Sequence, residues 1–121
     1  MKLRKRAKHL EKARRLITIG KLLSQGYTIE IALDFIKLHS DQAIAKQISQ
    51  VQSQLESGKP VNEALQLLEL PSLILSMIYF YEEQGDLANG FSIAGALYEK
   101  KGKERRLSLL SYCVIQLFWY G

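Results

Sequence analysis

The fold of this chain follows from one stretch, which reads Gly58-Lys-Pro-Val-Asn-Glu-Ala-Leu-Gln-Leu-Leu, then Leu70-Pro71-Ser72, and then Met77-Ile78-Tyr-Phe-Tyr-Glu82-Glu83-Gln84-Gly85-Asp86-Leu87. Its parts are a glycine turn, a short amphipathic helix, a Leu-Pro break, a second amphipathic helix and another glycine turn. No nucleophile, metal cluster or phosphate loop lies in it. The chemistry of these residues alone predicts a small helical domain.

The length and composition of the chain fit one domain. Its 121 residues are enough to bury a core, and helix formers dominate. The single cysteine, Cys113, excludes an internal disulfide. The basic N-terminus is not followed by a continuous apolar run, so it does not read as a secretory signal.

Charge is strongly segregated along the chain, whose net charge is +5. Residues 1–21 carry a net +8, residues 22–98 carry −6, and residues 99–121 carry +3. A basic end of this kind is typical of proteins that bind nucleic acid, an anionic membrane surface or an acidic protein partner, and it is also found in solvated, frayed termini. The basic arm lacks interleaved aromatic residues, which argues against base stacking.

Apolar spacing and turn residues predict six helices. The first covers residues 8–25, and Gly26 follows it as a left-handed cap. Thr28 is expected to cap the second helix and Ser40 the third, with Asp41 in the first turn of the third. Gly58 ends the third helix.

The second half of the chain continues this pattern. Pro60 is expected in the first turn of the fourth helix, and Ser72 as the cap of the fifth. The fifth helix, residues 73–84, is apolar on most sides and is therefore expected to be central. Gly85 closes it, and the sixth helix begins near Asp86 or Leu87.

The residues expected in the core share helical spacing and apolar character. They are Leu16, Leu23, Ala32, Leu33, Phe35, Ile48, Val51, Leu55, Ala64, Leu65, Ile74, Ile78, Phe91, Ala94 and Leu97.

Three segments of the chain resemble one another around Gly26, Gly58 and Gly85. Each is a helix end, a glycine and a new helix that opens with a small residue followed by a large one. Such segments are helix hairpins, in which the glycine provides the reversal. The predicted fold class is therefore all-α, an antiparallel six-helix bundle built of three helix hairpins, running into the start of a transmembrane helix.

The C-terminal residues look like an entry into a membrane. Residues 107–121 contain no charge, but they stop short of the roughly 20 residues that a spanning helix needs. The flanking residues have the expected character: basic before the run (Lys100, Lys101, Lys103, Arg105, Arg106) and aromatic at its end (Phe118, Trp119, Tyr120). The alternative is an amphiphilic last helix packed on the bundle. The predicted division is a basic arm at 1–9, a domain at 10–106 and a truncated membrane helix at 107–121, with the domain on the cytoplasmic side.

The order of these motifs resembles the cytoplasmic domain of the type II secretion F and type IV pilus platform-protein family, most of all its Gram-positive competence branch. The matching residues fall in the three hairpins: Leu22, Leu23, Gly26, Ile29, Ala32 and Leu33; Gly58, Val61, Glu63, Ala64 and Leu65; Met77, Ile78, Glu82, Gly85 and Leu87. Tyr81 and Gln84 replace a glycine and a serine of the family motif. The resemblance covers residues 10 to 112, which is one domain of a longer family pattern, so the chain is interpreted as a fragment or a frame-shifted copy.

The resemblance implies a non-enzymatic protein of the inner membrane. Family members contact the hexameric assembly ATPase and pass its motion to pilins or pseudopilins, which in the competence branch serves DNA uptake. We therefore expect an ATPase, pseudopilins and membrane lipid as partners, and homo-oligomers are possible. No cofactor is expected.

The best candidate for a site is the turn that closes the fifth helix. Its acids predict a partner-binding surface made of Glu82, Glu83, Gln84, Gly85 and Asp86. The carboxylates of Glu82, Glu83 and Asp86 could also hold a divalent cation, as in some family members, although a helix-dipole partner and surface acids explain them as well. His9, His39 and Cys113 are interpreted as structural or surface residues.

Two further classes of function stay open. A small basic helical nucleic-acid-binding protein would bind with an affinity that falls steeply with salt. An enzyme is a weaker alternative, because the sequence shows no catalytic constellation.

Overall fold

The computed structural model describes residues 2–100, and within that range every regular element is a helix. The elements are α1 (Lys2–Ser24), α2 (Ile29–Leu38), α3 (Gln42–Glu56), α4 (Val61–Ala64), the 3₁₀ segment η1 (Leu65–Leu68), α5 (Ser72–Glu83) and a last described helix over residues 87–100. The all-α prediction is confirmed for these residues. The expected start of a membrane helix at 107–121 lies outside them.

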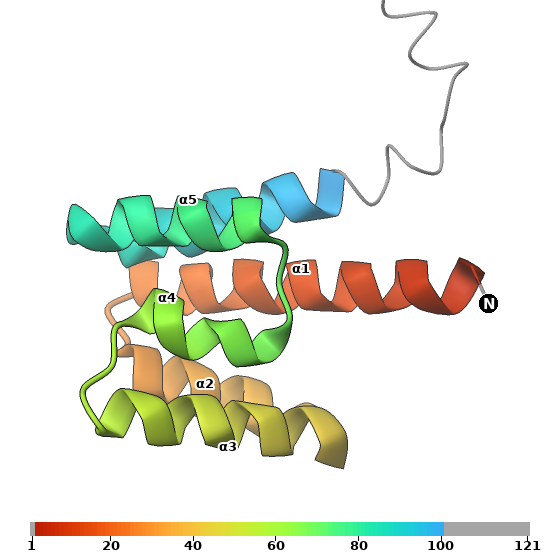
Figure 1. Cartoon of the computed structure of the whole chain (residues 1–121), viewed down its shortest axis with the longest axis horizontal. Coiled ribbons are helices and arrows are strands. Elements are labelled where there is room, and N and C mark those ends of the chain that lie inside the picture. The colour runs from red at the N-terminus through yellow and green to blue at the C-terminus, as the bar shows by residue number, and fades with distance from the viewer. Residues whose placement is uncertain (1, 101–121) are drawn as a thin grey trace, which may run out of the picture.

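Helix α1 lies in the middle of the molecule. Figure 1 shows α2 and α3 on one side of it and α5 with the last described helix on the other, with α4 and η1 between α3 and α5. The prediction that residues 73–84 form the central helix was wrong. Only Ile74 and Ile78 of α5 are buried, whereas Tyr79 and Phe80 are 48% and 57% exposed. Helix α5 packs through one face, so the apolar residues on its other faces stay exposed.

The first helix begins earlier than its apolar pattern suggests. The periodicity predicted a start at residue 8, but α1 begins at Lys2. Lysine and arginine are good helix formers, so a basic segment can continue a helix without a buried stripe. The predicted boundary of a basic arm at residue 9 therefore falls inside a continuous helix.

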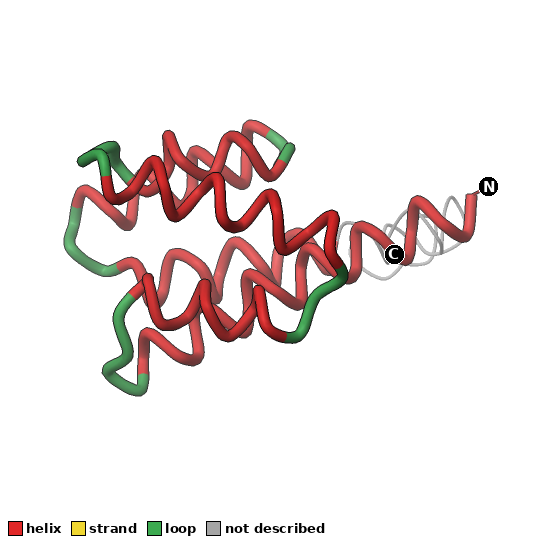
Figure 2. Tube along the Cα trace, turned by 90° about the horizontal axis from the view of Figure 1, so that it is seen from below, coloured by secondary structure: helices red, strands yellow, loops and turns green. Residues whose placement is uncertain are grey.

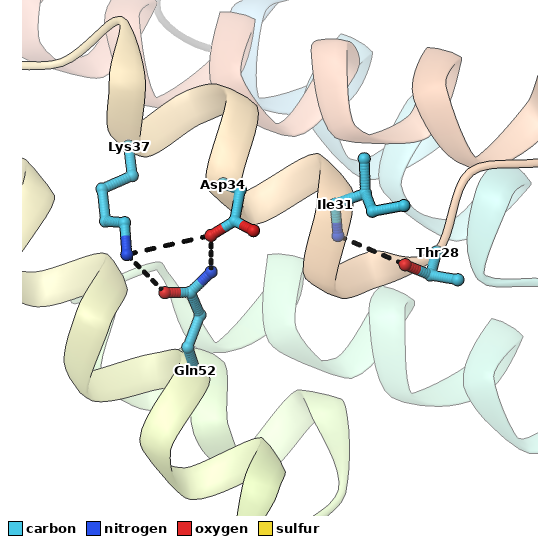
Figure 3. A network of polar contacts seen from close by, with 5 residues as sticks. All are labelled: Thr28, Ile31, Asp34, Lys37 and Gln52. Carbon is cyan, nitrogen blue, oxygen red and sulfur yellow. Dashed lines mark hydrogen bonds and ion pairs between the residues drawn. The ribbon is translucent and has the colours of Figure 1, made fainter.

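The helix caps agree with the sequence in one case and differ in two. Thr28 caps α2, because its hydroxyl oxygen accepts a hydrogen bond from the Ile31 N–H at 3.2 Å (Figure 3). Asp41, not Ser40, caps α3: its carboxylate accepts from the Ile44 N–H at 2.9 Å. The Ser40 hydroxyl instead donates to the carbonyl of Ile36 at 2.6 Å.

The third cap that was predicted, Ser72, is the first residue of α5. Pro71 occupies the N-cap position, where it makes no side-chain hydrogen bond. Pro60 likewise lies one position before its predicted place, as the N-cap of α4. Both prolines precede their helices, where the fixed φ is compatible with the chain entry and the missing N–H leaves no ladder bond unmade.

The three glycine turns have the same hydrogen-bonding pattern. Gly26, Gly58 and Gly85 all have positive φ, at 98°, 94° and 72°. In each turn the glycine N–H bonds to the carbonyl three residues back, at 3.0 Å, and the next N–H bonds to the carbonyl five residues back, at 2.9–3.2 Å. This pair of bonds is the Schellman motif, which satisfies the last carbonyls of a helix. The internal repeat in the sequence is therefore a repeat of one turn geometry.

All three glycine turns lie at one end of the molecule, which we call the glycine-turn end. Figures 1 and 2 show this end on the left, while the connections at 39–41 and 69–71, the first turns of α1 and residue 100 lie toward the other end. The arrangement arises because successive long helices run in opposite directions (Figure 1).

Side-chain hydrogen bonds join α2 to α3. The Gln52 amide donates to Asp34 at 2.7 Å and accepts from the Lys37 ammonium at 3.0 Å, and Lys37 lies 3.8 Å from Asp34 (Figure 3). These exposed and half-buried contacts fix the register of the two helices more than they add to stability.

The core is close to the predicted one. Eleven predicted core residues are buried and three, Leu23, Leu55 and Leu97, are partly buried against the core, but Phe35 is 43% exposed. Six further residues are buried that the list of expected core residues leaves out: Ala13, Ile19, Ile36, Val61, Leu70 and Tyr98. Helical spacing alone places Ile36, Val61 and Tyr98 on inward faces. None of the helices within residues 2–100 combines the length and the apolar character that crossing a bilayer requires.

Candidate partner-binding site at the glycine-turn end

Glu82, the acid at the centre of the predicted partner surface, faces the start of α4. Its carboxylate accepts hydrogen bonds from the backbone N–H groups of Val61, at 2.8 Å, and Asn62, at 3.2 Å. These are two of the N–H groups that the first turn of a helix leaves unpaired, and Pro60 has no side chain that could pair them. Glu82 therefore caps α4 from a different helix and joins the end of α5 to the Gly58 turn.

The other predicted partner residues remain at the surface. Glu83, Gln84 and Gly85 are exposed. The Asp86 carboxylate is half-buried and accepts a hydrogen bond from the Asn89 amide at 2.8 Å. Within the predicted cluster, the Glu82 carboxylate therefore points inward, whereas Glu83, Gln84 and Gly85 are exposed.

Two of the three predicted cation ligands, Glu82, Glu83 and Asp86, already make hydrogen bonds within the domain. The Glu82 carboxylate already accepts two backbone hydrogen bonds, and the Asp86 carboxylate is paired with Asn89. Across the described part of the chain, no three His, Cys, Asp or Glu side chains are grouped so that they could hold a metal ion.

The glycine-turn end is acidic beyond the predicted cluster. The exposed acids Glu30, Glu56 and Glu63 lie in the first turn of α2, at the end of α3 and in α4, each next to a glycine turn. The sequence analysis did not group them with the predicted cluster because they lie beside the Gly26 and Gly58 turns, whereas that cluster lies at the Gly85 turn. The internal repeat could have predicted this grouping. Antiparallel helices that reverse at equivalent glycines place those glycines, and the acids beside them, at the same end of the molecule.

Of the predicted membrane-proximal residues, the structure describes Lys100 alone. Lys100 is exposed at the end of the described chain. The others, Lys101, Lys103, Arg105, Arg106, Phe118, Trp119 and Tyr120, lie outside the described residues.

An apolar stripe on α2 was also missed. Ile31, Phe35 and Leu38 follow helical spacing away from the buried face of α2, and they are 49%, 43% and 81% exposed. Tyr27, in the turn before α2, is 49% exposed. Phe35 was placed in the core because it adjoins Ile36, but only Ile36 faces inward. The Phe35 ring lies against the ring of His39, with centroids 4.5 Å apart.

Comparison with known proteins gives two matches. Residues 15–115 match the family model described as type II secretion system protein F. Over 85 residues the chain is 34% identical to a ComG operon protein 2 homolog from Halalkalibacterium halodurans, a match that covers 70% of this chain and 26% of that relative. The chain thus spans about a quarter of the length of the curated relative. No solved structure matches it.

Proposed function

Because this chain belongs to the family of type II secretion system F proteins, we propose that it acts as a non-enzymatic platform domain at the inner membrane. In this proposal the domain faces the cytoplasm and links the assembly ATPase to the polymerisation of pseudopilins, and the assembled system serves DNA uptake. The observation that carries the proposal is the family match over residues 15–115, and the 34% identity to a ComG operon protein 2 homolog favours the competence branch.

The polarity of the fold supports an orientation for this platform. The chain leaves the described domain at residue 100, and five Lys and Arg at 100–106 precede the uncharged run 107–121. Basic residues beside an apolar segment mark the cytoplasmic side of a membrane. The glycine-turn end then faces away from the bilayer (Figure 1), where a cytoplasmic ATPase can reach it.

The packing of α1 against the last described helix supports a mechanical role. The two helices approach with backbone atoms in contact: a Cβ added to Gly95 would lie 2.9 Å from the backbone nitrogen of Ile17, and one added to Gly20 would lie 2.7 Å from that of Ser92. Close-packed helices move as one body, because their interiors deform little. A displacement applied at the glycine-turn end would therefore reach residue 100.

Site-specific photo-cross-linking to the purified assembly ATPase of the same organism tests this proposal. A photoreactive residue at Gln84, which is exposed at the glycine-turn end, is expected to cross-link to the ATPase. The same residue at Ser49, which is exposed on α3, is the matched control and is expected to give no product. Cross-links from Ser49 alone would place the partner on another face. Absence of any binding between the chain and the ATPase would contradict the platform function.

A further inference from the structure

A groove runs between α1 and α2, which lie beside each other in Figure 1. It encloses a hollow of about 360 Å³. Arg14 and Thr18 line it from α1, Phe35 and Ile36 line it from α2, and the turn at 39–41 lines one end. A hollow of this volume can admit side chains of a partner molecule. We call it the α1–α2 groove.

The α2 wall of the groove is the apolar stripe formed by Ile31, Phe35 and Leu38. These three exposed residues are spaced i, i+4 and i+7, so they share one side of the helix. Figure 3 shows the Ile31 side chain pointing away from α3 and from the contacts of Gln52. The stripe itself contains no charged residue, which is typical of the core of a protein interface.

The α1 wall of the groove carries positive charge at the same spacing. Arg14, Thr18 and Lys21 are also spaced i, i+4 and i+7, and the two basic residues are exposed. With a rise of 1.5 Å per residue, Arg14 and Lys21 lie about 10 Å apart along the helix axis. Because α1 and α2 run in opposite directions through the Gly26 turn, the basic series and the apolar stripe lie antiparallel to each other.

Both acids that line the groove already interact with groups of the domain. The Glu11 carboxylate lies 3.6 Å from the Arg15 guanidinium, and the Asp41 carboxylate caps α3. Among the described residues, no acid is paired with Arg14 or Lys21. The α1 wall can therefore attract negative charge from a partner.

We propose that the α1–α2 groove binds an amphipathic helix of a partner protein, with the apolar face of that helix against the stripe and its Asp or Glu side chains beside Arg14 and Lys21. An amphipathic helix repeats its apolar residues every three or four positions, which matches the repeat of both walls. Its side chains can enter the hollow, whereas a flat bilayer surface cannot. The phosphates of a nucleic acid fit the two cations but not the apolar stripe.

Fluorescence anisotropy with designed peptides and the 121-residue chain tests the inference. The probe is a labelled amphipathic helix of about 18 residues, which is long enough to be helical, with leucines along one face and glutamates beside them. A second peptide has lysine in place of each glutamate, so it keeps the apolar face and reverses the charge. We expect the acidic peptide to bind saturably and the basic peptide to bind at least about tenfold more weakly.

Two phenylalanine variants test the apolar wall. Phe35→Ser removes the centre of the stripe and should weaken binding of the acidic peptide by roughly tenfold or more. Phe80→Ser makes the same change at an exposed position of α5, a helix without basic residues, and should bind like the parent chain. Both side chains are exposed, so both variants should keep the Tm of the parent within a few degrees.

Two charge variants test the basic wall. Arg14→Gln/Lys21→Gln should weaken binding of the acidic peptide by roughly twofold to thirtyfold, as expected for two exposed ion pairs. Lys46→Gln/Lys59→Gln removes the same net charge at exposed positions outside the groove and should leave binding unchanged.

Three results would overturn the inference. Equal weakening by Phe35→Ser and Phe80→Ser would mean that the peptide associates with any exposed apolar surface. Equal binding of the acidic and basic peptides would contradict the role of Arg14 and Lys21. If the acidic peptide does not bind, while Phe35→Ser abolishes self-association in ultracentrifugation or binding to phosphatidylglycerol vesicles, the groove binds a second copy of the chain or a bilayer instead.

Discussion

Replacing Gly95 with alanine tests how closely α1 and the last described helix approach each other. On an isolated helix, Gly→Ala is stabilising by about 0.8–1.0 kcal/mol, because alanine loses less backbone freedom. At Gly95 the added Cβ would lie 2.7 Å from the Ile17 Cγ1, 2.9 Å from the Ile17 backbone nitrogen and 3.0 Å from the Ala13 carbonyl oxygen. Two of these three atoms belong to the backbone of α1, so they can move away only if the helix moves.

The expected result is a loss of stability in spite of the better helix former. Overpacking of a closed contact costs about 1–3 kcal/mol. After the gain in propensity is subtracted, the free energy of unfolding should fall by up to about 2 kcal/mol, which corresponds to a decrease in Tm of up to roughly 16 °C for a domain of this size. Urea and thermal denaturation followed by far-ultraviolet circular dichroism measure both quantities.

The neighbouring residue provides the control. Ala96 is exposed on the same helix, so Ala96→Gly reports the propensity term without the contact and should cost about 0.5–1 kcal/mol. If Gly95→Ala instead raises the Tm, the two helices are not in backbone contact and the argument that they move as one body fails.

Four shorter predictions concern single side chains. Glu82→Ala should lower the free energy of unfolding by about 1–3 kcal/mol because it leaves two N–H groups of α4 without their acceptor, whereas Glu83→Ala should change it by less than about 0.5 kcal/mol; equal effects in urea denaturation would refute the cap. Asp41→Ala should cost about 1 kcal/mol in the same assay, and no loss would mean that α3 is not capped there. Gly85→Ala should cost about 1–2 kcal/mol from its positive φ alone, since no atom lies within 4 Å of the added Cβ; an unchanged Tm would contradict the left-handed turn. Phe35→Ser should leave Tm within a few degrees of the parent value, and a large drop would place Phe35 back in the core.

The sequence predicted most of the helices because its turns are punctuated by residues with strong local preferences. Gly26, Gly58 and Gly85 each adopt the left-handed conformation that glycine alone tolerates without cost. The Thr28 cap was predicted for a similar reason, since its hydroxyl acts within three residues. Interactions between residues that are close in the sequence can be predicted from the local preferences of those residues.

The errors concern contacts that are decided by neighbours distant in the sequence. The competition between Ser40 and Asp41 for one cap depends on whether the serine bonds back to α2, which it does through Ile36. Phe35 is a large apolar residue of the kind that cores contain, but it is 43% exposed and its ring lies against that of His39 rather than in the core. The inward direction of the Glu82 carboxylate was not predictable either, because the N–H groups that donate to it lie 20 and 21 positions earlier.

The cap that Glu82 provides has a consequence for the order in which this domain opens and closes. Helix α4 has only four residues and continues into η1, so it is far too short to be stable alone. Its first N–H groups are paired only when the end of α5 is in place, so the two segments should exchange their amide hydrogens as one cooperative unit. A force that displaces the Gly85 turn would then break the hydrogen bonds from Glu82 to α4. The Gly58 turn, which precedes α4, would lose its connection to α5 at the same time.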